Sequence, residues 1–258
     1  MDAATKTGPQ VHDAWAKRLN DPLDPAIRSL ERLDSSSLSE RVYAQLRTAL
    51  MRGELAPDQR LKIGDVAVRL GTSETPVREA VFQLAREGAL EIKPRHYVRV
   101  RRLSASEYLQ VRDIRLNLEP LAAERALPHI QTDDIAALRA VHARLVAAEA
   151  SHDYPAAVHA NFEFHFGLYL RSSMPILIET LESLWVRAGP LFNYLYPHGH
   201  PTYDGAHQHE TVLEALERKD GYMLREAIRQ DLIEGGRNFV RHLQAMEPQT
   251  SEARPAIK

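Results

Sequence analysis

Residues 61–92 read LKIGDVAVRLGTSETPVREAVFQLAREGALEI, a stretch in which two short helical patterns precede a short apolar run. In the first pattern Val66 and Leu70 give a predicted helix its apolar side, and Gly71 ends that helix. The second helix is predicted to begin within the Ser-Glu-Thr-Pro of residues 73–76. Its Ser or Thr can cap the free amides there, and a proline in the first turn loses no hydrogen bond. The stretch therefore predicts two short helices joined by a tight turn, and then a strand.

The apolar side of the second helix is made by Val77, Val81 and Leu84. Its polar side carries Thr75, Arg78 and Gln83. We expect the apolar side to pack and the polar side to be exposed. A short helix, a turn with Gly and a second helix with an exposed polar start form the helix-turn-helix plan, which places the second helix in a DNA major groove. An ordinary helical hairpin has the same spacing, so spacing alone leaves both interpretations open.

The segments on either side of this helix pair favour DNA binding. An amphipathic helix is predicted before the pair, starting at residues 37–40 and ending near Gly53. Two short strands are predicted after it, at residues 89–92 and 97–100. The Lys-Pro-Arg-His of residues 93–96 joins the strands as a basic hairpin tip. A helix-turn-helix followed by such a hairpin is a winged helix, whose tip can contact phosphates or enter a minor groove.

Three ordered motifs give this region a close resemblance to a known family. They are GELAP at residues 53–57, LGTSETPVREA at 70–80 and LAREG at 84–88. They resemble the N-terminal domain of the GntR-family transcription regulators, which implies a double-stranded DNA operator as partner. The DNA-contacting residues are then predicted at the start of the second helix and on the hairpin tip, at Ser73, Glu74, Thr75, Arg78, Lys93, Arg95 and His96.

Two positions depart from the family pattern. The family often has Arg where this chain has Glu74, and some members have a DNA-contacting Arg where it has Gly64. Arginine reads guanine well, whereas a glutamate can only accept a hydrogen bond, for example from the N4 amine of cytosine. The family's usual operator therefore does not follow from the resemblance.

The composition fits a soluble regulator. A chain of 258 residues is long enough for two domains and a sizeable core. It has no cysteine, which excludes disulfides, thiolate metal sites and thiol nucleophiles. No apolar run approaches the roughly 20 residues that span a membrane, and the start of the chain lacks the apolar core of a signal peptide. We therefore expect a cytoplasmic protein with no membrane partner.

The formal net charge of −2 is unevenly divided along the chain. Residues 36–103 hold 13 Lys and Arg against 8 Asp and Glu, a charge of +5. A basic module suits phosphate binding, although a chance cluster on a solvated face would give the same excess. The predicted organisation is a flexible N-terminal arm at 1–35, a winged helix-turn-helix domain at 36–103, a helical effector-binding and dimerisation domain at 104–246, and a flexible tail at 247–258.

The pattern beyond residue 104 is almost wholly helical. Apolar residues repeat at helical spacing, and candidate helices cover 105–127, 132–150, 154–172, 175–195, 206–218 and 220–245. The predicted fold is mainly α, with a small β-hairpin wing and a C-terminal all-α bundle. This half resembles the FadR-type C-terminal ligand domain, through RLNLEPLAA at 115–123, NFEFH at 161–165 and HETVLEAL at 209–216.

One pair of polar residues in these motifs points to metal chemistry. Asn161 and His165 lie four apart, so their side chains project from one face of a helix. In many members of the family that this half resembles, an Asp and a His at this spacing hold a divalent metal together with two later His. The resemblance assigns the four positions to Asn161, His165, His209 and Asp231, a set that suits Zn, Ni, Mn or Fe. The alternative is a metal-free polar pocket of hydrogen-bonded side chains.

Other side chains of this half have two interpretations each. Arg115 is predicted either to bind the carboxylate of an effector or to form a helix-surface salt bridge with Glu119. An apolar part of the pocket could be lined by aromatic residues that otherwise pack in the core, namely Phe162, Phe164 and Tyr194. Further histidines precede His209 in a segment rich in Pro and Gly, at His198, His200 and His207, and this composition favours a solvated loop over the alternative of a second metal site.

Together these residues predict a ligand-responsive DNA-binding regulator rather than an enzyme. A homodimer on a two-fold operator is expected, because one winged helix reads too few bases. A small organic acid at Arg115, Asn161, His165 and His209 would shift the protein between DNA-competent and incompetent states, and repression released by the acid is the predicted direction. One alternative is a direct metal-ion sensor. Another is a metal-dependent hydrolase with Glu163 as its general base.

Overall fold

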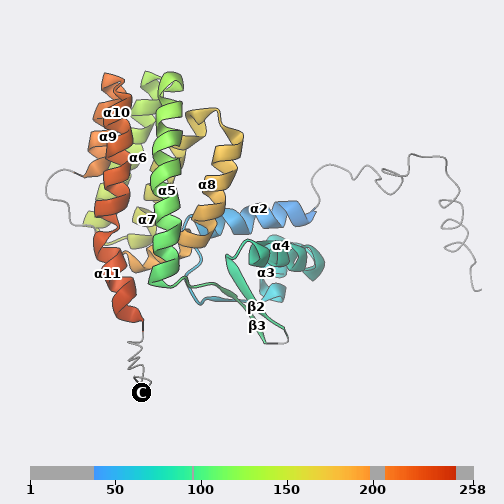
Figure 1. The fold of residues 1–258 in the computed structure, drawn as a ribbon. Coiled ribbons are helices and arrows are strands. Elements are labelled where there is room, and N and C mark those ends of the chain that lie inside the picture. Colours follow the sequence, from blue (N-terminus) through green and yellow to red (C-terminus); the bar gives the residue numbers. More distant parts are fainter. Residues whose placement is uncertain (1–37, 95, 198–206, 248–258) are drawn as a thin grey trace, which may run out of the picture. The chain divides into compact units, whose positions relative to one another are not determined.

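The computed structural model describes residues 38–94, 96–197 and 207–247 of the chain. The predicted N-terminal arm, Arg95 at the predicted wing tip, and His198 and His200 lie outside these residues. Within the described part, a small module of helices and short strands precedes a series of helices (Figure 1). The predicted fold class, mainly α with a small antiparallel sheet, is confirmed.

The helix-turn-helix forms where the sequence predicts it. The first three helices are α2 (Leu38–Met51), α3 (Ile63–Leu70) and α4 (Glu74–Arg86). Helix α3 ends at Gly71, whose φ of 64° is left-handed and suits a residue without a side chain. The apolar side of α4, made by Val77, Val81 and Leu84, is buried as expected. The predicted cap is wrong in one detail, because Ser73 occupies the N-cap position without a capping hydrogen bond from its side chain.

A three-stranded antiparallel sheet completes the winged helix. Strands β2 (Leu90–Lys93) and β3 (Tyr97–Val100) form the predicted hairpin, in which Glu91 lies opposite Arg99. A third strand, β1 (Arg60–Leu61), pairs with the other side of β3 and gives the order β1-β3-β2. The sequence does not predict β1, because two residues show no alternation and their partner strand lies far along the chain.

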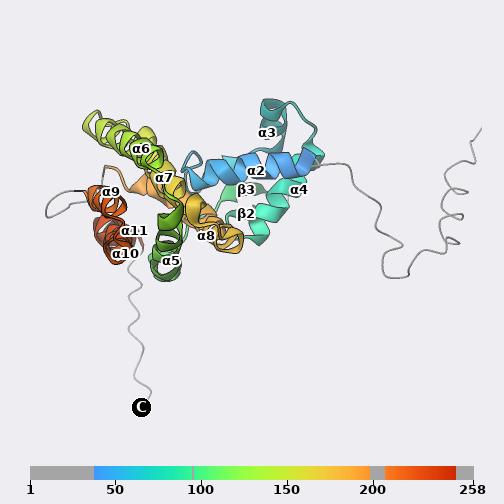
Figure 2. The same ribbon diagram turned by 90° about the horizontal axis from the view of Figure 1, so that it is seen from above.

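The rest of the described chain is helical. Its α-helices are α5 (Ala105–Ala126), α6 (Thr132–Ala150), α7 (Tyr154–Tyr169), α8 (Pro175–Ala188), α9 (Gln208–Arg218), α10 (Gly221–Gln230) and α11 (Arg237–Met246). Helices α5, α9 and α10 lie side by side in Figure 1, and the view from above in Figure 2 shows α6 beside α7. Their buried sides meet around Trp185, Tyr169 and Phe164. None of the helices in the described residues is long and apolar enough to span a bilayer.

The predicted helix over 175–195 ends early, at Ala188. The chain continues as a short 3-10 helix, η3 (Gly189–Tyr194), because Pro190 cannot donate a helical hydrogen bond. A Cβ on Gly189 would lie only 2.3 Å from the carbonyl oxygen of Leu50. A residue without a side chain is therefore required where η3 meets the end of α2.

The predicted helix over 220–245 is also interrupted. A π-helical turn, η4 (Asp231–Gly235), separates α10 from α11. A π turn holds an extra residue and so changes which later side chains share a face, and such turns are frequent at functional sites. Gly236 follows the turn, and a Cβ there would lie 2.8 Å from the carbonyl oxygen of Leu232. The interruption matters because Asp231, a predicted metal ligand, is its first residue.

Candidate functional site

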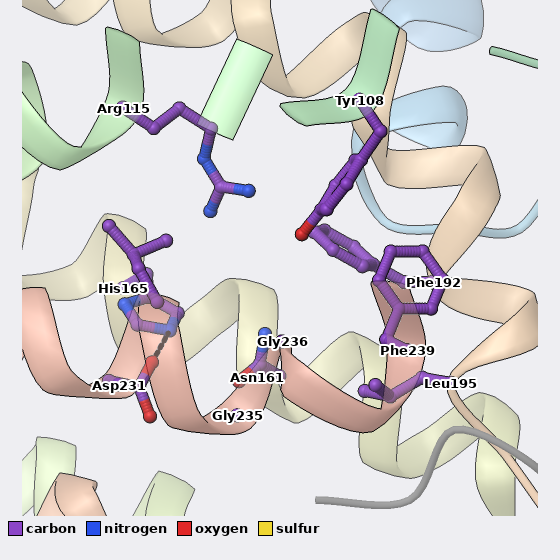
Figure 3. Close-up of a pocket in the computed structure, with 11 residues that line it drawn as sticks. Tyr108, Arg115, Asn161, His165, Phe192, Leu195, Asp231, Gly235, Gly236 and Phe239 are labelled. Atoms are coloured by element: carbon purple, nitrogen blue, oxygen red, sulfur yellow. Dashed lines mark ion pairs between the residues drawn. The ribbon is translucent and has the colours of Figure 1, made fainter. Parts of the chain in front are cut away.

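A small polar cavity lies among α5, α7, η3 and the π turn. Its volume is about 50 Å³, and its walls include Tyr108, Arg115, Asn161, His165 and Asp231 (Figure 3). One water needs roughly 10–15 Å³ of such volume, so the cavity admits an ion with a few waters or a small polar group. Four of the side chains that the sequence assigns to effector or metal binding thus come together at one cavity.

His165 and Asp231 face each other at this cavity. Nε2 of His165 lies 3.3 Å from Oδ2 of Asp231, and Nδ1 lies 3.0 Å from the hydroxyl of Tyr169. That hydroxyl donates its own proton to Glu119 over 2.9 Å, so Nδ1 of His165 carries the proton that it shares with Tyr169. Nε2 of His165 therefore faces the Asp231 carboxylate, and presents a lone pair to it whenever the ring carries a single proton. This arrangement requires a cation or a second proton between the two groups.

His209 is fully buried beside the same carboxylate. Its Nε2 lies 3.9 Å from Oδ1 of Asp231, and its ring stacks on Phe164 with centroids 3.8 Å apart. Neither ring nitrogen has a hydrogen-bond partner among the described residues. Burial, together with three neighbouring imidazoles, lowers the pKa of His209 well below its ordinary value. The ring is therefore neutral at neutral pH and can act as a ligand.

Arg115 forms the predicted ion pair with Glu119, but in the core rather than on a helix surface. Its Nε donates to Oε1 of Glu119 over 2.6 Å, and both side chains are almost wholly buried. Burial alone would lower the pKa of Arg115, but the adjacent carboxylate raises it above its ordinary value. In Figure 3 the guanidinium points into the cavity. The two predicted roles of Arg115 are therefore compatible with each other.

The aromatic wall of the cavity differs from the prediction. Phe192 and Phe239 line it, whereas Phe162, Phe164 and Tyr194 do not. These three pack in or against the surrounding apolar core, which is the alternative that their sequence context allowed. Phe192 and Tyr194 both lie in η3, and of the two only Phe192 faces the cavity.

The sequence did not single out several residues that hold the site together. Glu119 accepts a hydrogen bond from Nε1 of Trp185 over 2.7 Å, in addition to those from Arg115 and Tyr169. One signal for Tyr169 was present, because it follows His165 by four residues and so shares a face of α7 with it. Trp185 lies on another helix, and no local spacing links it to Glu119.

Glu163, the predicted base of the hydrolase alternative, does not line the cavity. Its carboxylate instead lies 2.6 Å from Arg144 and 3.1 Å from His159. An ion-paired carboxylate on this side of α7 has no access to a ligand held by His165. The sequence could not settle the orientation of Glu163, because it stands between two aromatic residues.

The predicted DNA-contacting residues within the described chain are all exposed, namely Ser73, Glu74, Thr75, Arg78, Lys93 and His96. Four of them, Glu74, Arg78, Lys93 and His96, also line a groove of about 570 Å³ between α4 and the hairpin. The groove therefore combines the start of the second helix with the wing, as a winged helix that docks on DNA requires.

Glu74 and Arg78 form an ion pair on the exposed side of α4. The distance between Arg78 Nη2 and Glu74 Oε2 is 2.6 Å, and about half of each side chain is exposed. A Cβ on Gly64 would lie 3.4 Å from Oε1 of Glu74. Gly64 and Glu74, the two departures from the family pattern, are thus neighbours in space. Glu74 also orients Arg78, which the sequence predicts to contact DNA.

Two family models match the chain over these two regions. The model described as "Bacterial regulatory proteins, gntR family" matches residues 38–100, and the FCD domain model matches residues 110–234. The HTH-type transcriptional regulator McbR of Escherichia coli K12 is 34% identical over 186 residues, which cover 71% of this chain and 84% of McbR. The chain belongs to the GntR family of bacterial transcription regulators.

Further relatives of this GntR-family chain are also regulators. The HTH-type transcriptional repressor RspR of Escherichia coli K12 is 26% identical over 200 residues, which cover 76% of this chain and 86% of RspR. The solved structure of Escherichia coli McbR/YncC matches with a TM-score of 0.72 and 31% identity, and covers 83% of this chain and 100% of that one. A regulator from Rhodococcus sp. RHA1 has the same fold, with a TM-score of 0.63, 18% identity and coverage of 83% and 100%. The homologues are DNA-binding regulators rather than enzymes, which removes the hydrolase alternative.

The donors of this GntR-family chain fit a divalent ion beside the cavity. One donor atom each from His165, His209 and Asp231 lies within 4.8 Å of the others, and all three residues are buried. An ion among them would satisfy a nitrogen of His209 and separate the His165 lone pair from the Asp231 carboxylate. Asn161 on the same wall offers a neutral oxygen. Imidazole and carboxylate together suit Zn, Ni, Mn or Fe.

Proposed function

We propose that this GntR-family regulator is a homodimeric repressor that leaves its DNA operator when a small organic acid binds in the helical domain. The acid would occupy the cavity of Figure 3. Its carboxylate would meet the guanidinium of Arg115, which Glu119 and burial hold in place. Tyr108 would offer its hydroxyl from the opposite wall, so the remainder of the acid is expected to be polar and short.

A divalent ion held by His165, His209 and Asp231, with Asn161 as a weaker donor, belongs to this proposal. When bound, such an ion supplies open coordination positions for carboxylate oxygens. Asp231 carries the one negative charge of the donor set, whereas Arg115 and Glu119 neutralise each other. A divalent ion would leave one positive charge in the cavity, and a monocarboxylate would neutralise it.

The DNA part of the proposal rests on the exposed groove of the winged helix. Arg78 and Lys93 supply positive charge there, and Glu74 supplies an acceptor for a base edge. One such surface covers few bases, so two copies on a two-fold operator would provide useful specificity. Light scattering of the purified protein, with and without operator, measures whether it is a dimer.

The observation that carries the ligand part of the proposal is the buried Asp231 carboxylate beside His209, whose ring nitrogens have no hydrogen-bond partner among the described residues. The experiment combines metal analysis, selection of an operator from random DNA, and a thermal-shift screen of organic acids. We expect an acid that raises the melting temperature of metal-loaded protein to weaken operator binding. His165→Ala and Asp231→Asn should each lose the metal and the acid response while operator affinity without acid stays near wild type.

Two further variants sharpen this experiment. Asn161→Asp should tighten the metal, because it adds a charged oxygen at a corner now occupied by a neutral amide. His129→Ala is the control, because His129 is exposed on the 3-10 turn η1 (Leu127–His129), outside the cavity. Wild-type protein that binds no divalent metal even when supplied with it would remove the metal from the proposal and leave a metal-free polar pocket.

A second candidate function, direct sensing of a metal ion, is favoured by the size of the cavity. About 50 Å³ accommodates an ion and a few waters more readily than it accommodates a drug-sized ligand. In that case the metal alone would release the operator, and no organic acid would change the melting temperature. The same screen, run with and without metal, therefore separates the two candidates.

A further inference from the structure

A second group of histidines adjoins His209. His142 of α6, His207 immediately before α9 and His209 have one ring nitrogen each within 4.8 Å of the others. The ring centroids of His142 and His207 are 4.9 Å apart, and those of His207 and His209 are 4.3 Å apart. Neither His142 nor His207 lines the cavity of Figure 3. The group is therefore a separate set of donors. It shares only His209 with the acid site, by which we mean the proposed organic-acid and metal site around His165, His209 and Asp231.

Two members of this group are buried without hydrogen-bond partners among the described residues. His142 is 6% exposed and His209 is fully buried, and neither ring nitrogen of either residue has a hydrogen bond within the described chain. The carboxylate of Glu210 lies 3.7 Å from Nε2 of His142, which is too long for a hydrogen bond. Leaving buried polar atoms unsatisfied destabilises a protein, so a retained cluster of them points to an occupant.

We propose that His142, His207 and His209 form a second metal site, which binds one borderline divalent transition-metal ion such as Zn²⁺ or Ni²⁺. Three imidazole nitrogens are the donors that these ions prefer over Mg²⁺ or Ca²⁺, which take oxygen ligands. The exposed Glu210 carboxylate lies 3.7 Å from His142 and would complete the set from the solvent side.

Binding of an ion would change the start of α9. Nδ1 of His207 accepts a hydrogen bond from the backbone N–H of His209 over 3.1 Å and so caps this helix. A neutral imidazole has a single lone pair, so His207 exchanges the cap for the metal when it coordinates. This exchange of the helix cap for the metal at His207 occurs two residues before His209. His209 is also the residue that lies beside Asp231 in the acid site. An ion at the second site would therefore weaken binding at the first.

The inference goes beyond the proposed function and does not require it, because His142 and His207 take no part in the acid site. The test starts from a variant without the cavity donors, which carries His165→Ala and Asp231→Asn. Calorimetric titration of this variant with Zn²⁺ should give one ion per chain, and Co²⁺ should give the visible absorption of a histidine-bound ion. Asp231→Asn alone, which keeps the side-chain volume, gives the same comparison if the double variant does not fold.

Adding His142→Phe to this variant should weaken Zn²⁺ binding by more than about 100-fold, since the loss of a ligand exceeds the effect of losing an outer-shell partner. Phenylalanine keeps the ring contacts of His142 but offers no donor, so the melting temperature without metal should not fall. His129→Phe, at an exposed histidine, should leave Zn²⁺ binding unchanged.

In otherwise wild-type protein, His142→Phe should keep the acid response, which separates this inference from the proposed function. The inference is overturned if the His165→Ala/Asp231→Asn variant binds no Zn²⁺. It is also overturned if adding His142→Phe leaves the Zn²⁺ affinity of that variant unchanged.

Discussion

Glu119 organises the polar core of the helical domain from behind the cavity. It accepts hydrogen bonds from Arg115, Trp185 and Tyr169 at 2.6, 2.7 and 2.9 Å. Tyr169 in turn holds Nδ1 of His165. One carboxylate thereby fixes both the guanidinium that points into the cavity and the tautomer of a candidate metal ligand. Hydrogen-bond partners of this kind orient metal ligands, and losing one typically weakens metal binding by roughly 10–100-fold.

Arg115→Ala tests this network directly. We expect it to lower the free energy of unfolding by about 3–5 kcal/mol, because the buried Glu119 charge loses its counter-charge. The double variant Arg115→Met with Glu119→Gln should recover most of that stability, since a neutral amide needs no counter-charge, but should not recover the acid response. Denaturant unfolding measures the stability, and operator binding with increasing concentrations of the organic acid measures the acid response. A single variant as stable as wild type would contradict the buried pairing.

The Glu74–Arg78 pair gives a second prediction at the residue scale. Glu74→Arg removes the partner of Arg78 and places a guanine-reading donor at the start of α4. We therefore expect the preferred operator to change, as measured by selection from random DNA. Glu79→Arg is the matched control, because Glu79 is exposed on the same helix and the charge change is equal. Identical preferred sequences for wild type and Glu74→Arg would mean that Glu74 does not face bases.

The π turn η4 matters most among the elements of the helical domain. It contributes Asp231, Leu232 and Gly235 to the cavity wall, and Asp231 is the first residue of the turn. The turn is followed by Gly236, where the carbonyl of Leu232 leaves no room for a side chain. The position of the only carboxylate among the four predicted ligands thus depends on an irregular element.

Gly236→Ala should therefore affect both stability and metal binding. Its Cβ would lie 2.8 Å from the Leu232 carbonyl, so we expect a loss of about 1–3 kcal/mol in the free energy of unfolding and a weaker metal site. Gly221→Ala is the control, because its Cβ would meet only Leu127 at an ordinary 3.6 Å. Thermal unfolding with and without metal compares the two. Equal behaviour of both variants would argue against a structural role for the π turn.

The elements also show how far the sequence could predict this fold and site. The helix-turn-helix and the hairpin follow from local periodicity and turn residues, so α3, α4, β2 and β3 fall where expected. The π turn does not, because the apolar spacing of residues 220–245 is also that of one continuous helix. The face shared by Asn161 and His165 is a local property of α7. The proximity of His142 to His209 is not, because only packing of α6 against α9 brings them together.

At the scale of the whole molecule, the cavity and the winged helix meet through η3. Phe192 lines the cavity, and the next residue, Asn193, donates from Nδ2 to the carbonyl oxygens of Gly53 and Pro190 over 2.8 and 2.9 Å. Gly53 lies just after α2 with a φ of 70°, and a Cβ there would lie 2.8 Å from Val158. Under the proposed function, a ligand that displaces Phe192 would therefore act on the end of α2.

Helix α2 carries this contact onward to the recognition helix. Arg47 in α2 forms an ion pair with Glu182 of α8 and lies 3.8 Å from Glu87, which directly follows α4. Tyr43 donates a hydrogen bond to the same Glu87 over 2.6 Å. The winged helix thus contacts the helical domain along α2, through the Arg47–Glu182 ion pair, the Asn193 hydrogen bond to Gly53 and the close packing of Gly189 on Leu50. The proposed release of the operator would need these contacts to adopt a second arrangement, so that an acid could shift the population from DNA-competent to incompetent states.

Asn193→Ala tests whether η3 transmits the signal. The variant should bind the acid with nearly wild-type affinity, because Asn193 does not line the cavity. The acid should release the operator less effectively, with the coupling free energy reduced by about 0.5–2 kcal/mol, because η3 no longer holds Gly53. Calorimetry measures acid binding, and fluorescence anisotropy of a labelled operator measures release.

Asn117→Ala provides the control for this last variant, because Asn117 is exposed and bonds only within its own helix, to the carbonyl of Asp113. It should leave both acid binding and operator release unchanged. If Asn193→Ala releases the operator at the same acid concentration as wild type, η3 is not the route. The signal would then pass through α5, which carries Tyr108 and Arg115 into the cavity and follows the wing after only a few residues.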